Sequence, residues 1–147
     1  MAFSELCKFG EYYCFGCCII DNAVPSREEL EDAFKRNTLT FKQFKNIKSF
    51  AERENTGAVL ACGICNNLVW KNNKIICPLH PQIAGEDMRK RTFCHKDYLC
   101  DTAERFNEWS KEKQERFLKF VKSKDPDWYT FSMNIENNSW LKEFQRQ

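Results

Sequence analysis

The sequence lacks a long hydrophobic run, a strong charge of either sign and any repeated or low-complexity tract. No segment approaches the roughly 20 apolar residues needed to cross a bilayer, which excludes a membrane-spanning helix. The first residues also lack the basic and apolar regions of a secretion signal, so we expect a soluble, cytoplasmic protein without a membrane partner. With 23 Lys and Arg against 21 Asp and Glu, the net charge of +2 gives no general attraction to polyanions.

Histidine is scarce, with 2 residues, whereas cysteine is abundant, with 9. Nearly all of these side chains fall in three short stretches: Cys14 to Cys18, Cys62 to His80, and Cys94 to Cys100. In a reducing compartment, cysteines at ligand spacing indicate metal sites rather than disulfides, and an odd number of them fits that interpretation. The sequence therefore predicts a protein built around bound metal.

The 147 residues suffice for one ordinary domain, and an apolar fraction of 42% supplies a hydrophobic core. We expect a single metal-binding domain over 1–147 in the α+β class, mostly helical, with a small zinc-ribbon-like β-hairpin and irregular cysteine-rich loops. Apolar periodicity and capping residues predict helices over 27–35, 40–54 and 101–123, and a hairpin joining 68–70 to 74–76. The tail from residue 128 is predicted as a short strand or loop and a last helical turn.

Two half-sites flank the predicted hairpin. Cys62 and Cys65 form a C-x-x-C turn, and Cys77 and His80 form a C-x-x-H turn. Because such a turn directs both of its donors to one side, the hairpin would bring four ligands to one tetrahedral zinc or iron ion. Two alternatives stay open: His80 is a surface turn residue while Cys77 belongs to another cluster, or Cys62 and Cys65 form a redox dithiol. The dithiol needs a helix after the first cysteine, and the residues that follow favour a strand.

A further C-x-x-C turn, from Cys14 to Cys17, is followed directly by Cys18. Neighbouring side chains of an extended backbone point in opposite directions, so Cys17 and Cys18 would serve different sites, or a site and the core. This turn cannot saturate an ion alone. Its missing ligands are expected among three later residues: Cys94, His95 and Cys100. Cys7 is a weaker candidate, since a buried cysteine also serves as a small apolar residue.

The order of these cysteines, from the C-x-x-C-C turn to C-x-x-H-P and a later cysteine, resembles a bacterial family of zinc- or iron-chelating cysteine-cluster proteins. That family is named for a C-x-x-C-x-x-C-C-type signature, and the resemblance covers Cys14 to Cys100. It implies a single cluster made of Cys14, Cys17, Cys18, Cys77 and either Cys94 or Cys100. The chain departs from the pattern at Glu11, where the signature has a further cysteine.

Zinc is the expected metal, with iron or an iron–sulfur cluster as the alternative. The expected ligands are Cys14, Cys17, Cys18, Cys62, Cys65, Cys77, His80, Cys94 and Cys100. We expect the metal to stabilise the fold of a cytosolic domain that presents a surface to a protein or nucleic acid. Few acid–base groups lie near the ligands, which disfavours catalysis. A redox or metal-handling enzyme with an open site is the first alternative. The second is nucleic-acid binding through Trp70 and nearby cations: Lys71, Lys74, Arg89, Lys90, Arg91 and Lys96.

Overall fold

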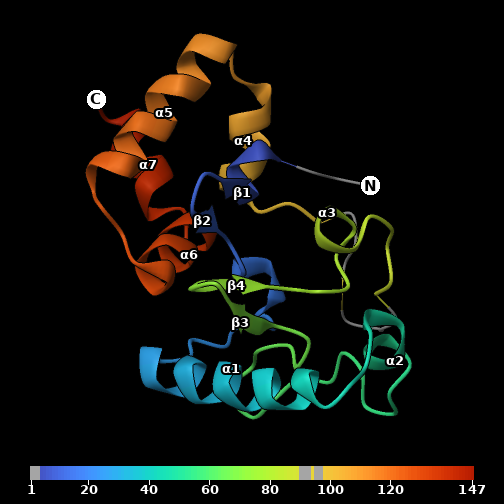
Figure 1. The fold of residues 1–147 in the computed structure, drawn as a ribbon. Coiled ribbons are helices and arrows are strands. Elements are labelled where there is room, and N and C mark those ends of the chain that lie inside the picture. Colours follow the sequence, from blue (N-terminus) through green and yellow to red (C-terminus); the bar gives the residue numbers. More distant parts are fainter. Residues whose placement is uncertain (1–3, 90–93, 95–97) are drawn as a thin grey trace. The chain divides into compact units, whose positions relative to one another are not determined.

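The computed structural model describes residues 4–89, 94 and 98–147, and its contacts divide the chain into two compact units (Figure 1). Unit 1 combines Met1–Cys17 with Lys96–Gln147, and unit 2 is the intervening Cys18–His95. Helices alternate with two small antiparallel hairpins, which confirms the predicted mixture of helix and hairpin. None of the described helices has the length and hydropathy that a membrane span requires. The expectation of one domain over the whole chain stays a prediction.

Unit 1 begins with a hairpin that the sequence did not predict. Its strands pair antiparallel around Gly10, with Lys8 opposite Tyr13 and Phe9 opposite Tyr12. The unit's elements are η1 (Glu5–Cys7), β1 (Lys8–Phe9), β2 (Tyr12–Tyr13), the first part of η2 (Gly16–Cys18), α4 (Asp101–Glu108), α5 (Lys111–Ser123), α6 (Trp128–Glu136) and α7 (Ser139–Gln145).

Aromatic rings from the hairpin and from the four helices form the core of unit 1. Phe9 lies 5.8 Å from Phe131 of α6, measured between ring centroids, and Phe117 of α5 meets Phe144 of α7 edge-on at 5.1 Å. Such tilted and edge-on contacts add to the free energy gained by removing the rings from water. The N-terminal hairpin and the C-terminal helices therefore share one core, although 78 residues of unit 2 separate them along the chain.

The prediction of one continuous helix over 101–123 is wrong. The structure has two helices there, because the chain is extended at Trp109 and a new helix begins after Ser110. The Ser110 hydroxyl accepts the N–H of Lys113, and serine stabilises a helix start better than it extends a helix. The prediction for the tail is wrong in its first part, since 128–136 is α6 rather than a strand or loop, whereas the predicted last helical turn is present as α7. Asp127 caps α6 by accepting the N–H of Thr130 at 2.8 Å.

Unit 2 contains the predicted hairpin. Asn72 and Asn73 have φ values of 53° and 63°, as a tight two-residue hairpin turn requires. The unit's elements, besides the single residue Cys18 of η2, are α1 (Arg27–Lys42), α2 (Ile47–Ala51), β3 (Val69–Lys71), β4 (Lys74–Ile76) and α3 (Pro81–Ala84). The Ser26–Glu29 capping box is present as predicted, but the predicted break after residue 35 is wrong, because α1 continues to Lys42.

Two polar residues in the middle of α1 attach this helix to β3, which lies beside it in Figure 1. The Asn37 side chain donates to the carbonyl of Leu68 at 2.9 Å, and the Thr38 hydroxyl accepts the N–H of Trp70 at 2.8 Å. These are the residues at which the sequence predicted a helix end. The Asn37 side chain bonds to the hairpin rather than to its own helix, and the Thr38 hydroxyl also donates to the Phe34 carbonyl one turn earlier at 2.6 Å, so the helix runs through both residues.

A second antiparallel contact in unit 2 joins the chain after Cys18 to the turn that contains Cys65. Ile19 and Ile64 form an isolated bridge, flanked by hydrogen bonds from Ile20 N–H to Gly63 at 2.8 Å and from Cys65 N–H to Cys18 at 3.2 Å. Gly63 has a φ of +97°, and a Cβ atom there would lie 2.4 Å from the Ala23 Cβ. Only glycine permits this close approach of the two segments.

Replacing Asn37 with alanine should lower the free energy of unfolding by about 1 to 3 kcal/mol, because the buried Leu68 carbonyl loses its donor. Denaturant titration measures this change. Arg36→Ala is the matched control on the exposed face of the same helix, and its effect should stay within about 0.5 kcal/mol. Equal effects of the two variants would show that the Asn37 bond does not stabilise the contact between α1 and β3.

Replacing Gly63 with alanine should destabilise the protein by more than the same change at Gly85. Both residues have positive φ, +97° and +85°, so both variants carry backbone strain of about 1 to 3 kcal/mol. Only the Gly63 variant adds a collision, since nothing lies within 4 Å of a Cβ at Gly85. Thermal unfolding of the two variants separates the effect of the collision from that of the backbone strain. Identical melting temperatures of the two variants would contradict the close approach of Gly63 to Ala23.

Candidate metal-binding site

The structure describes all 9 cysteines, and each carries a thiol rather than a disulfide. Among the described side chains, no three from His, Cys, Asp and Glu stand ready to coordinate a metal ion. The thiols nevertheless gather in two groups, one within each unit, that differ from the predicted partition.

In unit 1, the hairpin brings Cys7 and Cys14 together. The Cys14 N–H donates to the Cys7 carbonyl at 2.9 Å, which extends the antiparallel register of β1 and β2 by one pair. Directly opposite residues of an antiparallel pair place their side chains on the same face, with Cβ atoms about 5 Å apart. Cys17 follows in η2, and Cys100 stands at the start of α4.

The four thiols of unit 1 influence one another electrostatically. The pKa of Cys7 is raised to about 12, mainly by burial and to a smaller extent by the neighbouring Cys17 and Cys100. Burial also raises the pKa of Cys14 well above its usual value, and Cys7, Cys17 and Cys100 add to the effect. Burial raises the pKa of Cys100 to about 11. Since like charges raise a thiol pKa only over short distances, Cys7, Cys17 and Cys100 lie in the vicinity of Cys14, although not in the arrangement of a formed metal site.

Several cysteine sulfurs, in both units, also face backbone N–H groups. The Cys14 sulfur accepts the N–H two residues later at 3.4 Å, and the Cys65 sulfur does so at 3.3 Å. The backbone N–H two residues after Cys77, and that two residues after Cys100, also lower the pKa of the thiol, although burial raises it by more. Hydrogen bonds to the charged form favour a thiolate, so these turns are suited to sulfur that carries a negative charge.

In unit 2, the thiol group consists of Cys65, Cys77 and Cys94. The pKa of Cys77 is raised to about 12, mainly by burial; Cys65 and Cys94 contribute to the rise, and Arg89 opposes it. Arg53 lies near the same group: burial lowers its pKa, and the charges of Cys65 and Cys77 oppose that shift. Two guanidinium groups therefore accompany three thiols.

Arg53 holds the turn that follows Cys65. Its guanidinium donates to the side-chain oxygens of Asn66 at 3.0 Å and Asn67 at 2.8 Å, and lies 3.8 Å from the ring centroid of Phe50. The planar guanidinium can bond in its plane and stack on a ring at the same time. This arrangement keeps the Asn67 N–H directed at the Cys65 sulfur.

Arg89 ties Cys94 to the turn that contains Cys77. Its guanidinium binds both carboxylate oxygens of Asp87, at 2.8 and 3.0 Å, and lies 3.8 Å from the Cys94 sulfur. The preceding residue, Met88, donates its N–H to the carbonyl of Leu79 at 3.0 Å. Residues 87–89 therefore lie against the Cys77 turn and present Arg89 to both thiols.

The structure brings together only part of each predicted set. In unit 1 the charges of Cys17, Cys100 and the weaker candidate Cys7 all act on the pKa of Cys14, and metal binding by these residues stays a prediction. His95, another candidate ligand there, lies outside the described residues. The antiparallel register on either side of Gly10 is the sequence signal that could have paired Cys7 with Cys14.

The predicted ribbon ligands are arranged differently. The His80 Nδ1 atom accepts the N–H of Gln82 at 3.1 Å and caps the short helix α3. A neutral imidazole has one nitrogen lone pair that can accept, so a metal bound there would replace this hydrogen bond. Cys62 lies in a turn, and the residues after Cys65 lead into β3 rather than a helix. The prediction of a strand rather than a redox-type helix is confirmed.

The cluster implied by the family resemblance divides between the two units, with Cys14 and Cys17 in unit 1 and Cys18 and Cys77 in unit 2. Of the two later cysteines that the resemblance allows, Cys100 accompanies the first pair and Cys94 accompanies Cys77.

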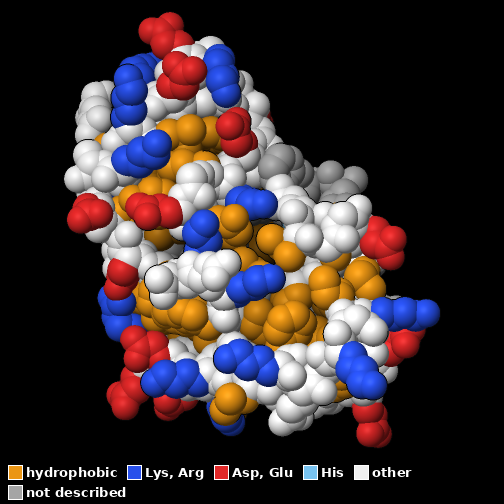
Figure 2. Space-filling view, in the orientation of Figure 1, with side chains coloured by type: hydrophobic (Ala, Val, Ile, Leu, Met, Phe, Trp, Pro, Cys, Tyr) orange, Lys and Arg blue, Asp and Glu red, His pale blue; other side chains and the backbone are white. Residues whose placement is uncertain are grey.

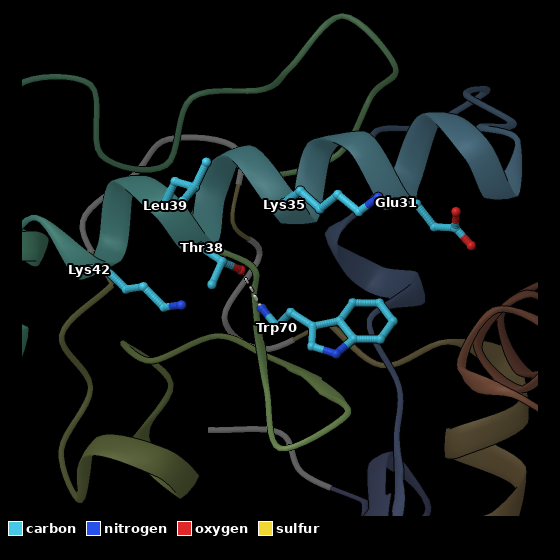
Figure 3. Close-up of a pocket in the computed structure, with 6 residues that line it drawn as sticks. All are labelled: Glu31, Lys35, Thr38, Leu39, Lys42 and Trp70. Atoms are coloured by element: carbon cyan, nitrogen blue, oxygen red, sulfur yellow. Dashed lines mark hydrogen bonds between the residues drawn. The ribbon is translucent and has the colours of Figure 1, made fainter.

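Unit 2 also has a groove of about 520 Å³ between α1 and β3. Most of the surface that lines the groove belongs to apolar atoms. The lining residues are Glu31, Lys35, Thr38, Leu39, Lys42 and Trp70 (Figure 3). Figure 2 shows hydrophobic side chains exposed over this helix and hairpin, with Lys and Arg side chains among them. Two cations and one carboxylate border the groove, so it suits an apolar group better than a run of phosphates.

Comparisons with protein-family models, with curated proteins and with solved structures found no match to this chain. The resemblance to a cysteine-cluster family therefore stays a prediction based on the order of the cysteines. The functional assignment depends on the positions of the thiols and on the groups that face them.

Proposed function

We propose that this protein binds zinc, and that Cys7, Cys14, Cys17 and Cys100 hold one ion that stabilises unit 1. The main support is the pairing of Cys7 with Cys14 across the N-terminal hairpin, where the Cys14 N–H donates to the Cys7 carbonyl at 2.9 Å. Cys17, in the turn after the hairpin, and Cys100, at the start of the distant helix α4, act on the pKa of Cys14.

The donor set fits the metal. Zinc is bound by four thiolates in a tetrahedron, at about 2.3 Å from each sulfur. Burial and, to a smaller extent, the charges of neighbouring thiols raise the pKa of Cys7, Cys14 and Cys100 and keep these three thiols protonated at neutral pH. A divalent cation among the sulfurs removes both effects, because it replaces the protons and attracts every thiolate. Binding requires the four side chains to turn inward until the sulfurs reach coordination distance.

A structural role follows from the chain topology of unit 1. The ion would join residues 7–17 to the start of α4, two segments that all of unit 2 separates along the sequence. Cross-linking distant segments reduces the entropy of the unfolded chain more than cross-linking close ones. Structural zinc contributes about 10 to 16 kcal/mol in small zinc-finger peptides, comparable with the net stability of a whole domain.

Zinc is preferred over an iron–sulfur cluster because of the packing around the thiols. Cys100 belongs to the buried core of unit 1, and Cys7 and Cys14 pack against that core. One ion needs only the four sulfurs around it, whereas a cluster also needs space for its bridging sulfides. A redox role would require that larger space.

Nucleic-acid binding has less support. The guanidinium of Arg89, one of the predicted phosphate ligands, is occupied by Asp87, and its side chain is only 9% exposed. Lys90, Arg91 and Lys96 lie outside the described residues. Trp70 lines the apolar groove, where Lys35 and Lys42 are accompanied by Glu31.

Protein purified under reducing, oxygen-free conditions should contain zinc and show no visible absorption. Elemental analysis with an absorption spectrum checks this. Removing the metal with a chelator should lower the melting temperature and increase hydrogen exchange in residues 7–17 and 100–108, because these segments carry the ligands. If the protein contains iron and shows visible charge-transfer bands, the bound group is an iron–sulfur cluster rather than zinc. If the protein contains no metal, the proposal is refuted.

Cys100→Ser should remove one zinc ion per chain and destabilise unit 1, since three thiolates and a hydroxyl bind zinc weakly. Cys62→Ser is the control, because Cys62 belongs to neither thiol group. Cys100→His tests ligation directly: imidazole can bind zinc, so this variant should retain the ion. If the serine and histidine variants hold as much zinc as the unaltered protein, Cys100 is not a ligand.

A further inference from the structure

We propose that unit 2 holds a second metal ion, bound by Cys18, Cys65, Cys77 and Cys94, in place of the ribbon site that the cysteine spacing predicts. This inference rests on the proposed function only in that both require the protein to bind metal. The two sites share no ligand. The ribbon site would instead use Cys62, Cys65, Cys77 and His80.

The pairing of Cys18 with Cys65 follows from backbone register. The bridge between Ile19 and Ile64 makes Cys18 and Cys65 directly opposite residues, and the Cys65 N–H donates to the Cys18 carbonyl at 3.2 Å. Opposite residues place their side chains on one face, and the neighbouring pair points to the other face. Ile64 is fully buried on its own face, so the two cysteines share the opposite face.

Cys77 and Cys94 complete the set. The register of β3 and β4, with Val69 opposite Ile76, places Cys77 opposite Leu68, whose N–H donates to the Cys65 carbonyl at 3.4 Å. In agreement with this placement, the charges of Cys65 and Cys94 act on Cys77. The hydrogen bond from Met88 to Leu79 places the chain that leads to Cys94 against the Cys77 turn. Arg89 then lies 3.8 Å from the Cys94 sulfur. Cys65 therefore connects the cross-strand pair to the other two thiols.

The charges around the group fit a four-thiolate site. A divalent ion with four thiolates carries two negative charges, and such a centre in a protein interior requires nearby cations. Arg53 faces Cys65 and Cys77, and Arg89 faces Cys77 and Cys94. Arg53 supplies compensating charge, whereas Arg89 shares its charge between Asp87 and the Cys94 sulfur, and both guanidinium groups are held in position by hydrogen bonds.

Neither His80 nor Cys62 is a ligand in this arrangement, and the structure gives a reason for each. His80 caps α3 through the nitrogen that a metal would need. Eight of the nine cysteines form two sets of four, and Cys62 is the ninth. The spacing of Cys62 and Cys65 is that of a ligand pair, but the register assigns Cys18 as the neighbour of Cys65.

The test is zinc per chain, measured by elemental analysis on reduced protein, for matched variants. Unaltered protein should hold two ions, while Cys94→Ser and Cys18→Ser should each hold one. The controls Cys62→Ser and His80→Gln should keep two. Cys94→His should recover the ion that Cys94→Ser loses, which separates ligation from simple packing. The double variant Cys94→Ser/Cys100→Ser should hold none.

Three results would overturn the inference. If Cys62→Ser and His80→Gln each lose an ion while Cys18→Ser and Cys94→Ser keep both, the ribbon site is correct. If the unaltered protein holds one ion that only Cys100→Ser removes, the second site does not exist and the proposed function stands. If the unaltered protein binds no metal, both proposals fail together.

Discussion

Buried sulfur cannot carry charge unless something nearby compensates it, and this constraint governs both units. Burial raises the pKa of Cys7 and of Cys77 to about 12 each, so at neutral pH both thiols are protonated. The groups that face the sulfurs nevertheless favour the charged form: backbone N–H groups in both units and two guanidinium groups in unit 2. Surroundings that favour thiolates, combined with burial that prevents them, are reconciled by a bound cation.

Local chemistry made part of the fold predictable. The capping box at Ser26 and the hairpin turn at Asn72 and Asn73 depend on residues a few positions apart, and the structure contains both. The predictions failed where a polar residue could serve either its own helix or a distant strand. Asn37 resembles a helix stop until Leu68 supplies a carbonyl to bond, and the sequence around it gives no sign of that partner.

The candidate ligands were predictable to a similar extent. Spacing identifies turns that can present sulfur, because a C-x-x-C segment is a local structure. Which turns meet is decided by strand register and by long connections. Cys7 was rated a weaker candidate because its partner is defined by pairing across the Gly10 turn, and Cys65 was assigned to Cys62 because the bridge between Ile19 and Ile64 has no local signature.

The consecutive residues Cys17 and Cys18 show how one chain can supply two separate ligand sets. They lie in a 3₁₀ turn rather than the predicted extended segment, and successive side chains there diverge by about 120° around the axis. The division of the chain into units falls between these two residues. Cys17 belongs with the thiols of unit 1, and the backbone of Cys18 pairs with Cys65 in unit 2. In the two proposed sites each unit supplies its own four thiols, so neither site needs a ligand from the other unit.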